Sequence, residues 1–227
     1  KDMSKLPQEL FPFFKELEGN NNRDWFEIHK PKFKKIESQV KIFGEQLKEK
    51  LASTEYVDRV KLFRIYRDVR FSKDKTPYKT HFGLSFHREK PANRGGYYIH
   101  IKPNDCFIAC GFWAPSKEDL LRIRKEMELD PDEFRALLEE PNFKTSWGTL
   151  QGDEVKTAPK GFSKEDPNID LIRKKMYLFR KGFTDKEVLR ADFFERITED
   201  FKNIRPFLDY MSSVLTTDLN GVSTLDD

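Results

Sequence analysis

The residues best suited to chemistry lie in one stretch of eighteen, RIYRDVRFSKDKTPYKTH, which runs from position 64 to position 81. It contains six Lys or Arg residues and only two Asp, about twice the number of cations that the overall composition would place there. Ammonium and guanidinium groups bind phosphate and carboxylate through charge-assisted hydrogen bonds. The stretch therefore predicts an anion-binding site.

Most of the charged side chains of this stretch receive a predicted role. Asp68 and His81 are the candidate catalytic acid–base residues, because carboxylates and imidazoles are common proton-transfer groups. The loop between the two halves of the stretch can add backbone N–H donors. The simpler alternative is a solvated charged hairpin whose lysines prevent edge-to-edge pairing. The candidate anion-binding residues are Arg67, Arg70, Lys73, Lys75 and Lys79.

Arg67 is predicted to point inward. In a strand from Leu62 to Phe71, alternation places it on the same face as Phe63, Ile65 and Val69. A buried unpaired charge costs several kcal/mol, so Arg67 needs a carboxylate or a bound anion. Asp68 points to the opposite face, and we therefore expect a partner elsewhere in the chain or in a ligand.

Three of the four histidines, His81, His87 and His100, fall in neighbouring predicted strands. If these strands pair, the imidazoles converge as metal ligands or as a general base beside the cations. The alternative is the solvated face of an antiparallel sheet, which we favour because no Asp, Glu or Cys ligand pattern accompanies them. The sequence also has no Walker, Rossmann or G-x-S-x-G motif. We expect no metal site and no cofactor.

Hydrophobic periodicity predicts the elements that position these residues. The sequence indicates an α+β fold, in which N-terminal and C-terminal helices pack a mostly antiparallel sheet with a central β-meander. We expect one domain over residues 1–227, with a frayed tail from 216 to 227. Helices are predicted at about 7–20, 21–29, 31–52, 115–127, 130–140, 166–176 and 191–215. Strands are predicted at 62–71, 80–87, 96–102, 106–113 and 176–183.

The string RDVRFSKDKTPYKTHFG resembles a family of conserved hypothetical proteins of bacteria and fungi, domain-of-unknown-function family 2461. NNRDWF, GGYYIHIKP, GFWAP, LQGDEVKTAPKGF and DPNIDLIRKKM strengthen the resemblance, which extends from about Leu6 to Phe207. It implies a single domain whose most characteristic segment is the basic hairpin, and it implies no activity. The segment CFIACGFWAP departs from the family pattern, where more glycine is expected before the Trp.

Composition limits the class of protein. A chain with 37% hydrophobic residues and 21 Phe can bury a large core, and it has no run of eighteen apolar residues that would span a membrane. Cys106 and Cys110 lie on one face of a predicted strand but more than ten ångströms apart at about 3.3 Å per residue. We expect reduced thiols and a soluble, cytoplasmic protein without a membrane partner.

Three functions fit these observations. The first is a pocket that binds a phosphorylated or carboxylated small molecule, and the sequence leaves open whether the protein is an enzyme. The second is a nucleic-acid-binding module in which aromatic rings stack on bases. It ranks lower because a pI near 8.6 is below that of typical nucleic-acid binders. The third is a structural or interaction protein whose charges pair internally. The stacking residues of the second would be Tyr66, Tyr78, Tyr97 and Tyr98.

Overall fold

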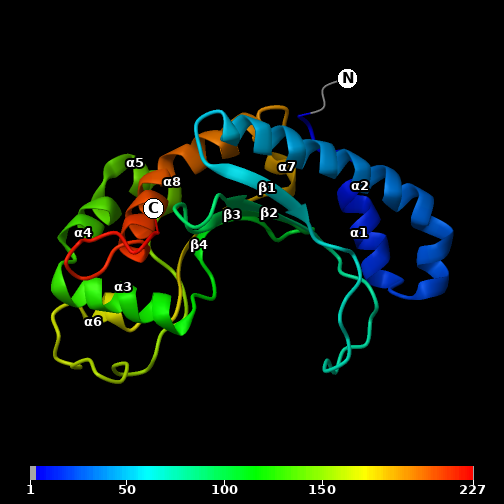
Figure 1. Ribbon diagram of the computed structural model, residues 1–227. Helices are drawn as coiled ribbons and strands as arrows, with labels where there is room; N and C mark the ends of the chain where they lie inside the picture. The colour runs from blue at the N-terminus through cyan, green and yellow to red at the C-terminus, as the bar shows by residue number, and fades with distance from the viewer. Residues whose placement is uncertain (1–3, 227) are drawn as a thin grey trace. The chain divides into compact units, whose positions relative to one another are not determined.

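The computed structural model describes residues 4–226, which form an α+β fold with eight helices and a five-stranded antiparallel sheet (Figure 1). The strands are consecutive neighbours in the sheet, in the order β1-β2-β3-β4-β5, so the predicted meander and fold class are confirmed. The strands are Val57–Leu62 (β1), Phe82–Arg88 (β2), Gly96–Ile101 (β3), Cys106–Phe112 (β4) and Tyr177–Phe183 (β5). The helices are Leu10–Gly19 (α1), Arg23–Ala52 (α2), Lys117–Leu129 (α3), Asp132–Glu139 (α4), Pro141–Trp147 (α5), Ile169–Ile172 (α6), Asp185–Val188 (α7) and Phe193–Leu215 (α8).

The chain divides into two compact units. Strands β2 to β5 and helix α8 each contribute residues to both units. The expectation of one domain over residues 1–227 stays a prediction. Unit 1 comprises Lys1–Phe86, Tyr98–Ile108 and Gly182–Thr198, and unit 2 comprises His87–Tyr97, Ala109–Lys181 and Glu199–Asp227.

In unit 1, helices α1 and α2 bury their apolar sides together with the start of β2. Phe14 lies edge-on to Phe82 with ring centroids 4.9 Å apart, and Phe33 stacks on Phe82 at 5.9 Å. All three rings are almost fully buried, and burying a Phe contributes roughly 1.5–3 kcal/mol. This aromatic core fixes the end of β2 from which His81 projects.

The predicted break before residue 31 is wrong, because α2 runs without interruption from Arg23 to Ala52 with Pro31 inside it. A proline inside a helix removes one hydrogen bond and costs about 3 kcal/mol. Phe26 and Phe33, on either side of Pro31, are each 1% exposed, and their burial offsets that cost. The Asn22 side chain caps the start of α2 by accepting a hydrogen bond from the Trp25 N–H at 2.9 Å.

The first predicted strand, at 62–71, is also misplaced. Strand β1 lies earlier, at Val57–Leu62, and residues 63–81 project from it as a long hairpin (Figure 1). The alternation of apolar residues did not mark a core face here, because Ile65 is 4% exposed while Phe71 is 95% exposed. The charged side chains of β1, such as Asp58 and Lys61, suit an edge strand and hid it from hydrophobic periodicity.

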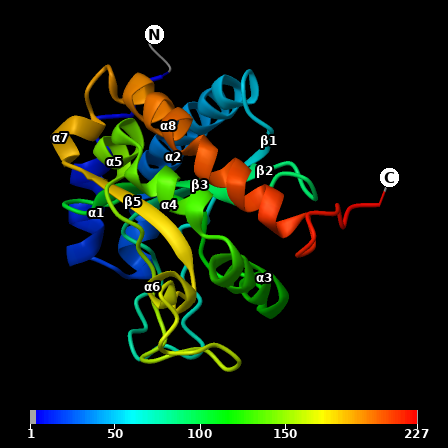
Figure 2. The same cartoon turned by 90° about the vertical axis from the view of Figure 1, so that its left-hand side faces the viewer.

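In unit 2, helix α3 packs beside α6, which precedes β5 (Figure 2). The Arg124 guanidinium joins α3 to this region by donating to the carbonyls of Ile172 and Lys174, each at 2.9 Å. Strands β4 and β5 approach closely at Gly111, where φ is +133° and a Cβ would lie 2.2 Å from the Tyr177 carbonyl oxygen. Only glycine fits this position.

Candidate functional site

The hairpin of residues 63–81 is anchored to the helices of unit 1 at its base. Its two arms pair through a Tyr66–Tyr78 bridge, with the Arg67 N–H donating to the Pro77 carbonyl at 2.9 Å. The Asn21 amide donates to the Tyr78 carbonyl and accepts from the Tyr78 N–H. The Tyr78 ring stacks on Phe26 at 4.0 Å. The turn between α1 and α2 therefore holds the hairpin by two hydrogen bonds to one residue, as a neighbouring strand does.

We call residues 68–76 the hairpin tip, and Arg67 braces it from within. Its guanidinium donates to the Thr76 carbonyl at 2.8 Å and to the Thr76 hydroxyl at 2.7 Å, and it pairs with Asp74 at 3.2 Å. The predicted carboxylate partner thus exists, and it is Asp74. The side chain is 25% exposed, so its burial is partial.

The other predicted cations of the tip bind groups inside the tip. Arg70 donates two hydrogen bonds to Asp68, at 2.9 and 2.7 Å, and this pairing lowers the pKa of the Asp68 carboxyl. Lys75 donates to the Val69 carbonyl at 2.7 Å. Lys73 is exposed. Arg70 and Lys75 thus bind different groups, the Asp68 carboxylate and the Val69 carbonyl, and the tip is a set of local pairs.

A second group of cations lies at the base of the hairpin, and we call it the basic cluster: Lys61, Arg64, Lys79 and Lys102. The ammonium groups of Lys61 and Lys79 lie over the same ring, that of Phe63, at 5.0 and 5.9 Å. Lys79 also donates to the Arg64 carbonyl at 2.7 Å. Within residues 4–226, no carboxylate lies at ion-pair distance from any of the four.

Beside the basic cluster, three rings form a stack that we call the imidazole stack: His81, His100 and Phe107. The centroids of His81 and His100 are 4.3 Å apart, and those of His100 and Phe107 are 4.6 Å apart. A hydrogen bond of 2.8 Å joins the Tyr98 hydroxyl to His100 Nδ1. His81 and His100 thus come together as the sequence suggested, whereas His87 belongs to unit 2 and its convergence stays a prediction.

The electrostatics of this region show a surplus of positive charge. Burial lowers the pKa of His81 to about 4, with further contributions from His100, Lys79 and Lys102. The pKa of Lys79 is lowered by burial, and then by Arg64 and Lys61. Both shifts disfavour the charged form, with burial as the larger cause and repulsion between cations as the smaller, while Asp105 acts on the pKa of His81 in the opposite direction. His81 is therefore neutral at pH 7, with one N–H donor and one acceptor.

The structure separates the two candidate acid–base residues. Asp68 lies at the tip and is bound by Arg70, while His81 lies at the base and stacks on His100. Of the five predicted anion ligands, only Lys79 belongs to the basic cluster. Lys61 and Lys102 were missed because they lie outside the dense stretch, at the ends of β1 and β3. Their position at strand ends next to the basic hairpin is the feature of the sequence that could have identified Lys61 and Lys102.

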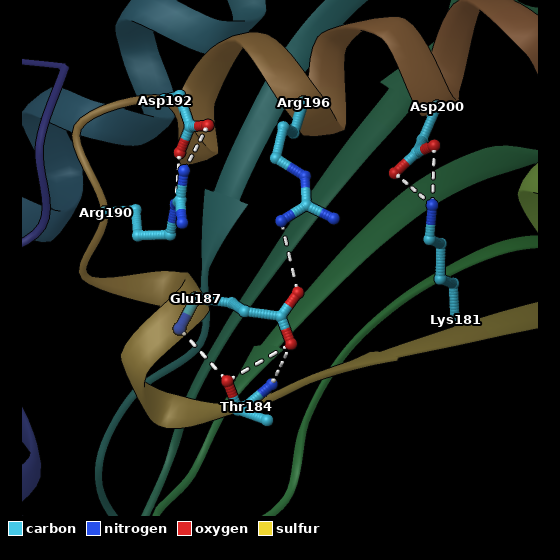
Figure 3. Close-up of polar contacts among 7 residues, drawn as sticks. All are labelled: Lys181, Thr184, Glu187, Arg190, Asp192, Arg196 and Asp200. Atoms are coloured by element: carbon cyan, nitrogen blue, oxygen red, sulfur yellow. Dashed lines mark hydrogen bonds and ion pairs between the residues drawn. The ribbon is translucent and has the colours of Figure 1, made fainter.

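Elsewhere the charges pair internally, as Figure 3 shows for the segment around α7 and the start of α8. In unit 1, Arg196 pairs with Glu187 at 3.1 Å and Arg190 pairs with Asp192 at 2.9 Å. Glu187 also completes a capping box with Thr184. In unit 2, the Lys181 ammonium contacts both carboxylate oxygens of Asp200. The basic cluster differs from these regions in having no such partners.

A surface groove of about 860 Å³ lies between residues 5–9 and α2. Leu6 and Ile36 are buried at its floor. Lys32, Lys35 and Gln39 line it at helical spacing, and Lys5 lies opposite them. Periodicity does not predict this groove, because residues 5–9 of its wall form turns and irregular structure.

Cys106 and Cys110 are both buried and form no disulfide within residues 4–226, as their spacing predicted. In the described part of the chain, no group of three or more His, Cys, Asp or Glu residues is arranged to hold a metal ion. No helix of residues 4–226 has the length and apolarity needed to cross a bilayer. Tyr78 and Tyr97 are buried and unavailable to stack on bases.

Comparison with known proteins gives one match. The model of a protein family described as "Conserved hypothetical protein (DUF2461)" matches residues 9–210. No curated protein and no solved structure matches. Residues 5–8, which form one wall of the groove beside α2, precede the matched segment, whereas the hairpin and the imidazole stack lie inside it.

Proposed function

We propose that this chain, which belongs to the DUF2461 family, binds a small phosphorylated or carboxylated molecule at the basic cluster of unit 1. One observation leads to this proposal: within residues 4–226, four cations without carboxylate partners lie beside the stacked imidazoles of His81 and His100, and the pKa of His81 is lowered to about 4. A protein that only needed surface charge would pair or disperse it, as the segments in Figure 3 do. A bound anion would relieve the repulsion between Lys61, Arg64 and Lys79.

The residues have distinct roles in this proposal. Lys79 supplies a positive charge beside His81, because it contributes to the lowered pKa of this imidazole and lies over the Phe63 ring. Lys102 acts on His81 from the end of β3. His81 can donate its N–H to a ligand oxygen or, if the ligand reacts, accept a proton from it. Tyr98 orients the imidazole of His100 through their hydrogen bond.

The proposal moves the expected site from the tip to the base of the hairpin. At the tip, Arg70 and Arg67 are already occupied by Asp68 and Asp74, so an anion would compete with carboxylates that are held nearby. At the base, no carboxylate of residues 4–226 lies at ion-pair distance from the four cations, although Asp105 acts on His81 from further away. A charge-assisted hydrogen bond contributes roughly 1.5–3 kcal/mol, enough for two or three contacts to hold a small anion.

A thermal-shift screen with phosphate, sulfate and small phosphorylated and carboxylated metabolites tests the proposal. A ligand at ten times its Kd stabilises the folded state by about 1.4 kcal/mol, which raises the melting temperature of a chain of this size by about 4 °C. We expect Lys79→Met to remove this rise and Arg70→Ala to preserve it. If Arg70→Ala removes the rise and Lys79→Met does not, the ligand binds at the tip instead. If no compound raises the melting temperature of the wild-type protein, the proposal fails and the alternative of a structural or interaction protein takes its place.

A further inference from the structure

The hairpin tip contains a feature that the proposed function does not use. Phe71 is 95% exposed, the highest value among the exposed large hydrophobic residues of residues 4–226. Among residues 4–226, its one ring contact is with the Arg70 guanidinium, whose centre lies 5.9 Å from the ring centroid. Almost the whole Phe71 side chain is thus open to solvent. Isolated exposed apolar residues are common, so exposure alone identifies nothing.

What distinguishes Phe71 is the rigidity of the loop that presents it. Arg67, Asp74 and Thr76 are linked by hydrogen bonds of 2.7–2.9 Å. Lys75 closes the loop onto the Val69 carbonyl, and the Ser72 N–H donates to the same carbonyl. The loop of residues 68–76 contains no buried apolar side chain. Its hydrogen bonds therefore do not serve to hold a hydrophobic core together. A rigid loop loses little entropy on binding, so the bracing favours a recognition role.

The charges of the tip indicate the chemistry of the partner. Residues 67–75 contain four cations and two carboxylates, and both carboxylates are bound to arginines. Lys73 and Lys75 keep uncompensated charges on either side of the loop that follows Phe71. Tyr66, which is 50% exposed, adds a second ring on the same hairpin. Exposed rings interleaved with cations bind single-stranded nucleic acid by stacking on bases and pairing with phosphates.

We infer that the hairpin tip binds single-stranded nucleic acid, with a base stacked on Phe71 and phosphates on Lys73 and Lys75. This inference is independent of the small-anion site at the base. Of the tyrosines expected from the sequence to stack on bases, Tyr78 and Tyr97 are buried, and the inference assigns the stacking to Phe71 instead. The sequence of the nucleic acid is not specified by this geometry, because every base presents a flat face.

Fluorescence anisotropy with a labelled twelve-residue oligothymidylate tests the inference on the full chain. We expect Phe71→Ala to weaken binding about tenfold, from the loss of one stacked base. Two phosphate contacts should lower the affinity about sevenfold between 50 and 200 mM salt. Phe71→Trp should keep or improve binding, whereas Phe71→Leu, which is apolar but not flat, should lose it. Ile28→Ala, which removes another exposed apolar side chain of unit 1, should bind as wild type does.

Two controls separate other partners from this one. An oligomer of abasic residues should bind wild type and Phe71→Ala equally, because it offers phosphates but no base. Vesicles in which about one third of the lipid is anionic test whether the ring inserts into a membrane surface. If it does, Phe71→Leu should keep its affinity for the vesicles, because insertion requires an apolar side chain but not a flat one. Equal binding of oligothymidylate by wild type and Phe71→Ala overturns the inference. So does binding to vesicles without binding to the oligonucleotide.

Discussion

The tip and the base of the hairpin 63–81 distribute charge and aromatic surface in opposite ways. At the tip, Arg67 and Arg70 are paired with carboxylates while Phe71 is exposed. At the base, the cations have no carboxylate partners within residues 4–226 while the rings around them are at least half-buried. The number of cations along the chain does not distinguish the tip from the base, because both regions are rich in Lys and Arg. At the base four cations lie together without carboxylate partners among residues 4–226, whereas at the tip two of the four cations are paired with carboxylates.

The largest expected difference between tip and base is in stability. Tyr78→Ala should lower the free energy of unfolding by about 3 kcal/mol, because it removes a ring that is 4% exposed and stacked on Phe26. Phe71→Ala should change it by less than about 0.5 kcal/mol, because the ring buries almost nothing. Urea unfolding of both variants measures the contrast. Similar losses would mean that the tip packs against other residues and that the comparison fails.

The next difference concerns pH. His81 in the folded protein has its pKa lowered to about 4 from an ordinary value of 6.5, so the unfolded chain binds a proton in this window and the folded chain does not. The free energy of unfolding should therefore fall as the pH decreases from about 6.5 to 4. After allowance for its partial exposure to solvent, we expect His81 to account for roughly 1.5 kcal/mol of this loss.

Unfolding of wild type and His81→Gln at pH 7 and pH 4.5 measures this contribution. The variant should lose less stability on acidification, because glutamine does not titrate. Lys102→Met should have a smaller effect in the same direction, since Lys102 is one of the cations that lower the pKa of His81. A wild-type profile parallel to that of His81→Gln would show that the imidazole is solvated and that the base is not a positive site.

The sequence predicted the sheet better than the hairpin, for a physical reason. Strands β2, β3 and β4 pack apolar side chains such as Phe86, Ile99 and Ile108 in the core, so periodicity reports their burial. The hairpin projects beyond the core, and its alternation between Phe63 and Phe71 reports nothing about packing. The continuity of α2 through Pro31 was also hidden, because it depends on the burial of rings on both sides of the proline.

The candidate site was predictable only in part. Residue types located the basic hairpin, and strand alternation placed His81 and His100 on faces that could meet. Strand alternation also places Asp68 and Arg70 on one face, but residue types alone do not show that the two groups pair with each other and that Arg70 is thereby occupied. Lys102 joins the site only because β3 lies beside β2. The sequence thus predicts which residues are charged, and the turn geometry decides which stay unpaired.

A smaller effect tests the packing at the base. A Cβ on Gly83 would lie 2.8 Å from the Tyr98 hydroxyl oxygen and 3.3 Å from Phe63. Gly83→Ala should displace the hydroxyl and break its hydrogen bond to His100, at a cost of about 1 kcal/mol. Tyr98→Phe removes the same bond without the steric contact and should cost slightly less. The double variant should cost less than the sum of the two, and simple additivity would mean that Gly83 and Tyr98 do not interact.

The smallest expected effect has the opposite sign and distinguishes a binding site from ordinary structure. Burial, Arg64 and Lys61 disfavour the charge on Lys79 and lower its pKa, so Lys79→Met should stabilise the ligand-free protein slightly, by roughly 0.3 kcal/mol after solvent screening. The gain should diminish as salt screens the repulsion, and Lys73→Met at the tip should show none. Melting temperatures of wild type, Lys79→Met and Lys73→Met at low and high salt measure this gain.

A cation that reduces stability is expected where its charge serves to bind a ligand. If Lys79→Met is clearly destabilising at both salt concentrations, the ammonium group is a structural donor to the Arg64 carbonyl, and the base of the hairpin is ordinary scaffold.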